Sequence, residues 1–358
     1  MQTILVRQYG YNDVKDTVEQ KMYNCGRNTG NLIWYESLKE HIKYDIEKYW
    51  ENIDEKSNTK YIFPLANHLI PEHMLLEYEA GFLKSDSDQA VLIGLGTQLT
   101  SELDTPKKLV SALSKEKIRA LQKMSFHSNT IGIRGNITGE CLELIGIKNY
   151  RIIGCPSFYS LGEEFCQIPT ASKGKICFNM NAEGVEGVAS YLNLLFEQYT
   201  EGKQRFIMQS MGDFPKTIIE NLEILPRHIE ERLPGLKMTA KNFTEYIKNN
   251  SSIFFEKKPW LDYLRKSDFT FSIGTRFHGN MIALLAGTPT LWITHDSRTE
   301  ELCEALKLPQ ITIREVIKIK DLEELVERCT YNDIFYKNYK KLFDNYMIFL
   351  EENEIEFT

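Results

Sequence analysis

The sequence predicts an α/β protein built from two Rossmann-like, doubly wound domains that face each other across a cleft. Short apolar runs alternate with segments of helical periodicity along most of the chain. The runs are apolar throughout, which is typical of parallel strands covered by helices on both faces. The pattern restarts near Lys173 after an irregular stretch, and 358 residues suggest two domains more readily than one.

Seven strands are expected, at residues 90–94, 131–133, 150–154, 176–178, 205–208, 269–273 and 290–293. Helices are expected at residues 32–38, 139–145, 184–199, 277–286 and 298–306. Thr138 is the predicted N-cap of the second helix, and Gly287 followed by Pro289 is typical of the end of the fourth. Residues 321–352 have an amphipathic helical pattern, and we expect a terminal helix to pack back across both halves. The predicted domains are therefore 1–170, 171–320 and a helical segment 321–358.

Composition excludes several classes of protein. The net charge of −7 provides no basic field for nucleic acid, so an anionic ligand needs a local positive pocket. No apolar run approaches the ~20 residues that span a bilayer, and the N-terminus does not resemble a signal peptide. The seven scattered cysteines indicate reduced thiols, and the cysteine and histidine spacings predict no metal site. We expect a cytoplasmic protein without a cofactor.

Polar side chains follow several of the predicted strands. Since ligands of open parallel sheets bind beyond the carboxyl ends of the strands, these residues are expected at one cleft. They are Gly96, Gln98, Arg134, Gln209, Ser210, Arg276, His278 and His295.

Arg276 and His278 carry the strongest signal, because they lie at a strand-to-helix turn. The free amides of a first helical turn favour an anion, an arginine adds a bidentate fork, and a histidine beside them can move protons. The alternative is a surface salt bridge for Arg276 and simple packing for His278; the spacing favours function. For Arg134, ligand binding and pairing with Glu140 are equally supported.

Other motifs have ordinary structural explanations. Gly94 and Gly96 fit a tight turn better than a nucleotide-binding fingerprint. The turn 28–31, which includes Asn31, either caps a helix or lines the cleft, and the stretch 295–298 has the same two interpretations. Trp260 and Tyr159 are either sugar-stacking residues or, more commonly, core residues.

The chain resembles the polysaccharide pyruvyl transferase family. The resemblance rests on residues 271–289 with their Arg-x-His block, on His295-Asp296-Ser297-Arg298, and on segments 28–31, 91–98 and 133–140. It implies two Rossmann-like domains similar to GT-B glycosyltransferases. It also implies transfer of pyruvate from phosphoenolpyruvate to two hydroxyls of a sugar in a surface polysaccharide, giving a cyclic ketal.

The resemblance assigns roles to the residues. Arg134, Arg276 and Arg298 would bind phosphoenolpyruvate and His278 would transfer protons, with the first domain on the acceptor side and the second on the donor side. The family commonly has lysine where this chain has Arg298, and arginine does not readily release a proton. Residues 9–24 look like an extra segment.

Two other functions stay open at this point: a GT-B glycosyltransferase that uses a nucleotide sugar, and a non-catalytic member of a polysaccharide-assembly complex. The sugar, the acceptor's form, the oligomeric state and a peripheral contact with the inner membrane face, where a lipid-linked acceptor would be met, also stay open.

Overall fold

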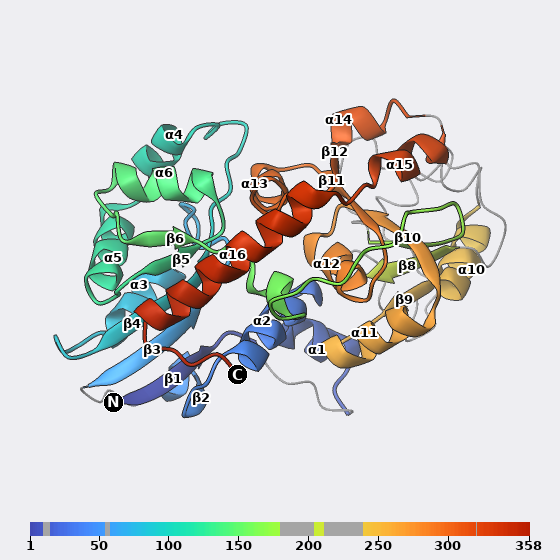
Figure 1. Cartoon of the computed structure of the whole chain (residues 1–358). Helices are drawn as coiled ribbons and strands as arrows, with labels where there is room; N and C mark the ends of the chain where they lie inside the picture. The colour runs from blue at the N-terminus through green and yellow to red at the C-terminus, as the bar shows by residue number, and fades with distance from the viewer. Residues whose placement is uncertain (10–14, 54–57, 180–203, 211–238, 320) are drawn as a thin grey trace.

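The structure is a computed structural model that describes residues 1–9, 15–53, 58–179, 204–210, 239–319 and 321–358. It contains two parallel six-stranded sheets with helices packed against them (Figure 1). Each of the seven predicted strands is present within two residues of its expected bounds. The predicted fold class, two Rossmann-like α/β domains, is confirmed. The helix expected at residues 184–199 lies outside the described residues.

The first sheet has the strand order β2-β1-β3-β4-β5-β6. Its strands are β1 (Gln2–Arg7), β2 (Ile46–Tyr49), β3 (Thr59–Pro64), β4 (Gln89–Leu95), β5 (Ile131–Ile133) and β6 (Tyr150–Ile152). All neighbours are parallel. The chain passes from β1 to β2 on one side of β1 and then crosses to β3 on the other side. The crevice of the sheet therefore opens between the carboxyl ends of β1 and β3.

The second sheet has the strand order β12-β11-β10-β7-β8-β9. Its strands are β7 (Lys175–Phe178), β8 (Gln204–Met208), β9 (Ser251–Ile253), β10 (Phe269–Gly274), β11 (Thr290–Thr294) and β12 (Gln310–Thr312). Numbered from its own first strand, this is the 3-2-1-4-5-6 order of dinucleotide-binding domains read from the other edge. Its crevice therefore opens between the carboxyl ends of β7 and β10.

Helices connect the strands in both sheets. In the first half these are α1 (Val18–Asn24), α2 (Gly30–His41), α3 (Leu75–Glu79), α4 (Pro106–Ala112), α5 (Lys115–Phe126) and α6 (Asn136–Leu144), with short 3₁₀ turns η1 (Trp50–Asn52), η2 (Ala80–Phe82) and η3 (Pro156–Tyr159). In the second half they are α10 (Ala240–Asn250), α11 (Lys257–Lys266), α12 (Phe277–Leu285), α13 (Ser297–Leu306), α14 (Ile313–Val316), α15 (Leu322–Arg328) and α16 (Asp333–Glu352).

The terminal helix α16 packs back across both halves, as predicted (Figure 1). Its aromatic residues belong to a core that also contains Val91 of the first sheet and Trp292 of the second. Phe349 lies over Gly132 of β5, where an added Cβ would come within 3.1 Å of its ring. One hydrophobic core therefore joins the two sheets and the last helix.

One detail of the predicted helices was wrong. Helix α6 begins at Asn136 with Gly135 as its N-cap, so Thr138 lies inside its first turn. The hydroxyl of Thr138 donates to Glu301 of α13 instead of capping its own helix. The segment 321–352 consists of two helices, α15 and α16, because Asn332 caps a new helix with bonds to the amides of Ile334 and Phe335.

Candidate functional site

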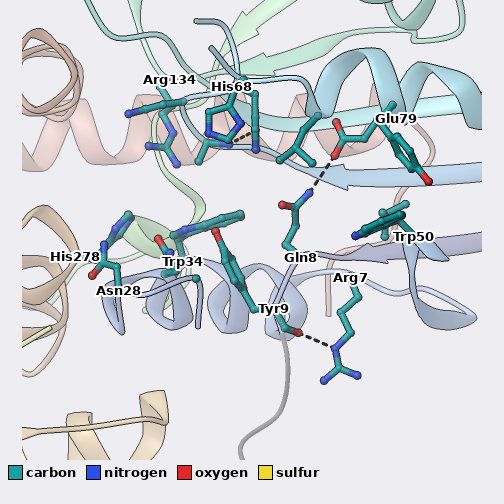
Figure 2. A pocket seen from close by; sticks show the side chains of 18 of the residues that line it. Arg7, Gln8, Tyr9, Asn28, Trp34, Trp50, His68, Glu79, Arg134 and His278 are labelled. Atoms are coloured by element: carbon teal, nitrogen blue, oxygen red, sulfur yellow. Dashed lines mark hydrogen bonds between the residues drawn. The ribbon is translucent and has the colours of Figure 1, made fainter. Parts of the chain in front are cut away.

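Two adjoining cavities lie at the carboxyl ends of the two sheets. The small cavity, about 70 Å³, lies beyond β10 and is lined by Asn28, Arg134, Gln209, Thr275, Arg276, Phe277, His278, His295, Arg298 and Leu302. The large cavity, about 440 Å³, lies beyond β1 and β3 and includes Gln8, Tyr9, Trp34, Trp50, Asn67, His68 and Glu79 in its lining (Figure 2). The cavities share Asn28, Arg134, His278 and Arg298. Both lie where the fold predicts a ligand.

The turn after β10 positions Arg276 and His278. The backbone amide of Arg276 donates to Asn179 O, which follows β7, at 2.9 Å. An added Cβ at Gly274 would lie 1.8 Å from that oxygen, so this close approach requires glycine. Arg276 is the N-cap residue of α12, and its guanidinium donates to Ser210 Oγ at 2.7 Å. His278 in the first turn then faces both cavities.

Arg134 follows β5 and is almost fully buried, with 3% of its surface exposed. Its Nε donates to Gly94 O at 2.9 Å, while its Nη2 has no hydrogen-bond partner among the described residues. An added Cβ at Gly96 would lie 2.7 Å from Arg134 Cδ, so glycine leaves room for the side chain. The described bond to Gly94 does not support the alternative pairing with Glu140. A buried cation with an unused donor is a strong site for an anion.

Arg298 reaches the site from the first turn of α13. Asp296 caps this helix by accepting from the Thr299 amide at 2.8 Å, as the capping interpretation predicted. Burial alone raises the pKa of Asp296, but Arg298, His295 and the hydrogen bonds from Thr299 together outweigh burial and lower it. Arg298 Nη2 donates to Asp296 at 3.2 Å, and its Nε has no hydrogen-bond partner in the described part of the chain. Arg298 thus also keeps one donor for a ligand.

His278 is held in its neutral form. Burial lowers its pKa well below the usual value, and the positive charges of Arg134 and Arg298 lower it further. Its Nε2 lies 3.4 Å from Cys155 Sγ. A neutral imidazole has a ring nitrogen that can accept a proton from a bound hydroxyl.

The other predicted cleft residues divide into two groups. Gln209 and His295 line the small cavity, and Asn31 lines the large one. Ser210, Gly96 and Gln98 support the lining: Ser210 accepts from Arg276, Gly96 lies against Arg134, and Gln98 contacts Asn67 at 3.2 Å.

Neither proposed sugar-stacking residue lines either of these two cavities. Trp260 and Tyr159 are both fully buried, with 0% of their surface exposed, so the core interpretation is correct. The aromatic residues that do line the large cavity, Tyr9, Trp34, Trp50 and Tyr78, were missed, as were Gln8, His68 and Glu79. Strands β1 and β3 were not predicted, so the residues that follow them had no assigned position. The apolar run in residues 4–6 was the available signal for β1.

The sequence model of the polysaccharide pyruvyl transferase family matches residues 28–297, which include Asn28, Arg134 and His278 of the four residues shared by the two cavities. This chain belongs to that family. Family membership makes it a transferase of polysaccharide biosynthesis and is consistent with a saccharide acceptor. No curated protein matches the chain in sequence.

Solved structures resemble this pyruvyl transferase family member at low identity. The UDP-GlcNAc 2-epimerase from Neisseria meningitidis bound to UDP-GlcNAc is 11% identical with a TM-score of 0.48, covering 99% of this chain and 100% of that one. The glycotransferase of kitacinnamycin is 10% identical with a TM-score of 0.39, covering 96% and 82%. In the described part of this chain, the helices are too short or too polar to cross a membrane.

Proposed function

We propose that this protein transfers pyruvate from phosphoenolpyruvate to two hydroxyls of one sugar in a surface-polysaccharide repeat unit, forming a cyclic ketal. The observation that carries the proposal is the lining of the small cavity, where Arg134, Arg276 and Arg298 surround His278. In a protein of net charge −7, this cluster creates a local positive pocket.

Phosphoenolpyruvate matches the charge of this pocket. It carries about three negative charges at neutral pH, from one carboxylate and one phosphate. The unused donors on Arg134 Nη2 and Arg298 Nε would each gain a charge-assisted hydrogen bond. Arg276, at the N-terminus of α12, would hold a second anionic group where the helix dipole also favours it.

The reaction balances with one base and no cofactor. A sugar hydroxyl attacks C2 of phosphoenolpyruvate while C3 receives a proton and becomes a methyl group. The second hydroxyl then attacks C2, the C2–O bond to phosphate breaks, and phosphate leaves with the remaining hydroxyl proton. Neutral His278 would accept the first hydroxyl proton and pass it to C3, and the arginines would stabilise the charge on the leaving phosphate.

The large cavity is the proposed acceptor site, because it adjoins the small cavity through Arg134 and His278 and is lined by aromatic and amide side chains. Family membership supports a saccharide acceptor there. The proposal also includes a lipid-linked saccharide that is met at the inner face of the membrane. Comparison of lipid-linked with synthetic acceptors tests this part.

The test is phosphate release from phosphoenolpyruvate across a panel of synthetic and lipid-linked glycosides, with the ketal product identified by carbon NMR. We expect His278→Ala to abolish ketal formation while the protein stays folded, and His127→Ala, a change outside both cavities, to leave it intact. Thermal-shift titration should show stabilisation by phosphoenolpyruvate and none by UDP or UDP-GlcNAc. Stabilisation by the nucleotides alone would support a glycosyltransferase instead, and near-normal turnover by His278→Ala would refute the assigned base.

A further inference from the structure

The far end of the large cavity contains a buried carboxyl group that the proposed reaction does not use. Glu79 ends helix α3 and is 3% exposed, and it lines the cavity at the end opposite His278 (Figure 2). Its Oε1 accepts from Gln8 Nε2 at 3.0 Å. Its Oε2 has no hydrogen-bond partner among the described residues. A buried polar atom of this kind costs free energy unless a ligand satisfies it.

Burial favours the neutral form of this carboxyl group. Burial raises the pKa of Glu79 to about 8, with a smaller opposing effect from the hydrogen bond of Gln8. A protonated carboxyl group offers one O–H donor together with acceptor oxygens, which suits the hydroxyls of an uncharged ligand. Arg7, a cation in the same lining, donates to Tyr9 O at 2.7 Å and lies 3.7 Å from Glu47. Glu47 partly offsets the charge of Arg7, because it also contacts Lys39 at 2.7 Å.

Aromatic rings stand beside the carboxyl group. Trp50 of η1 and Tyr78 of α3 form an edge-to-face pair with ring centroids 4.8 Å apart, and both line the cavity. Trp50 is 38% exposed and Tyr78 52%, so their faces are accessible to a ligand. Aromatic faces beside a few hydrogen-bonding groups fit a sugar ring, which has apolar faces and a polar edge.

The two ends of the large cavity belong to the crevices of different sheets. Gln8 follows β1, so this group lies at the crevice of the first sheet, whereas His278 belongs to the crevice of the second. A cavity of about 440 Å³ is within the range of sites for small ligands, roughly 300–1,000 Å³. We propose, resting on the proposed function, that Gln8, Glu79 and Trp50 bind an uncharged sugar unit next to the unit that receives pyruvate. The acceptor then contains at least two sugar units.

The experiment measures saccharide binding without phosphoenolpyruvate, so its outcome is independent of the proposed donor. The probes are the methyl glycosides of lactose, cellobiose and maltose, methyl glucoside as the one-unit comparison, and methyl glucuronide as the charged comparison. Binding is followed by calorimetry and by saturation-transfer NMR. We expect at least one neutral disaccharide to bind more tightly than methyl glucoside and methyl glucuronide.

Variants then place that disaccharide at the subsite. Glu79→Ala, Gln8→Ala and Trp50→Ala should each weaken its binding about tenfold or more, since each loses a hydrogen bond or a stacking face. Glu79→Gln, which keeps a donor and an acceptor, should bind within about threefold of the parent. Glu72→Gln, on an exposed neighbouring carboxylate outside the lining, should have no effect. Failure of all three disaccharides, preference for the glucuronide, or unchanged binding in Glu79→Ala and Gln8→Ala would each overturn the inference.

Discussion

Glu301 of α13 accepts two hydrogen bonds from Thr138, one from its backbone amide at 2.8 Å and one from its hydroxyl at 3.2 Å. The carboxylate lies at the N-terminus of α6, where amides have no partner within the helix and the helix dipole favours negative charge. An added Cβ at Gly135 would lie 2.4 Å from Glu301 Cγ, so the contact also requires glycine. A side chain of the second domain thereby fills an anion site of the first.

We expect Glu301→Ala to lower the free energy of unfolding by about 1–3 kcal/mol, because it leaves the Thr138 amide buried without its partner. Glu301→Gln keeps an acceptor oxygen and should lose less. Urea unfolding of the two variants measures this, with Glu304→Ala, an exposed carboxylate on the same helix, as the control. Equal stability of the Glu301→Ala and Glu304→Ala proteins would show that the contact contributes nothing.

The arginine at position 298 allows a direct comparison with the lysine common in the family. Arg298 uses Nη2 for Asp296 and has Nε unused, so it can hold Asp296 and a ligand together. Lysine keeps the charge but not this fork. We expect Arg298→Lys to weaken phosphoenolpyruvate binding about tenfold and Arg298→Gln about a hundredfold, as measured by calorimetry. Equal losses of affinity in both variants would mean that the two-donor geometry of the guanidinium, and not its charge, determines phosphoenolpyruvate binding.

His41 should make the protein sensitive to acid. Its two ring nitrogens have no hydrogen-bond partner within the described residues, and burial, with a contribution from Lys257, lowers its pKa to about 3. Between about pH 6.5 and 3 the unfolded chain binds a proton at His41 and the folded protein does not, so stability falls as the pH falls. His41→Phe removes this effect and keeps the ring contacts with Tyr346 and Phe357.

The measurement is urea unfolding of the parent and His41→Phe proteins at pH 7.5, 6.5 and 5.5. The stability of the variant relative to the parent should rise by about 1.4 kcal/mol per pH unit below about pH 6.5. A difference that does not change with pH would contradict the neutral, buried state of His41.

Gly274 tests the close approach that positions Arg276. Gly274→Ala would place a methyl group 1.8 Å from Asn179 O, so the ends of β7 and β10 must separate. We expect a loss of at least about 3 kcal/mol, with weaker phosphoenolpyruvate binding, from thermal unfolding and calorimetry. Gly81→Ala, where an added Cβ meets nothing within 4 Å, is the matched control. A normal melting temperature for Gly274→Ala would refute the assigned geometry.

The small cavity could be predicted from sequence because several of its residues follow strands with strong signals. The runs before Arg134 and Arg276 are buried on both faces and therefore apolar throughout, and in parallel sheets such strands end at one edge. The family resemblance pointed to the same two arginines and to His278, and the structure brings them together at one cavity.

The end of the large cavity near Glu79 could not be predicted from sequence, for physical reasons. Glu79 reaches the cavity from a helix of five residues, whose position depends on tertiary packing. Trp50 lies in a 3₁₀ turn directly after β2, a strand that was not predicted. A buried glutamate also looks the same in sequence as an exposed one, and only burial raises its pKa. Thr138 was misassigned for a related reason, since its partner Glu301 lies in the other domain.

The segment that contains α16 has a consequence for how the chain is made. Lys60 of β3 donates to Asn353 O at 2.9 Å, and Asn353 in turn donates to Thr130 O beside β5 at 3.0 Å. These hydrogen bonds join the first sheet to residues at the end of α16. The ribosome adds those residues only after the whole of the second sheet. A nascent chain that stops before α16 would expose the apolar surface beneath it, so synthesis of the first domain is expected to depend on chaperone protection until the helix arrives.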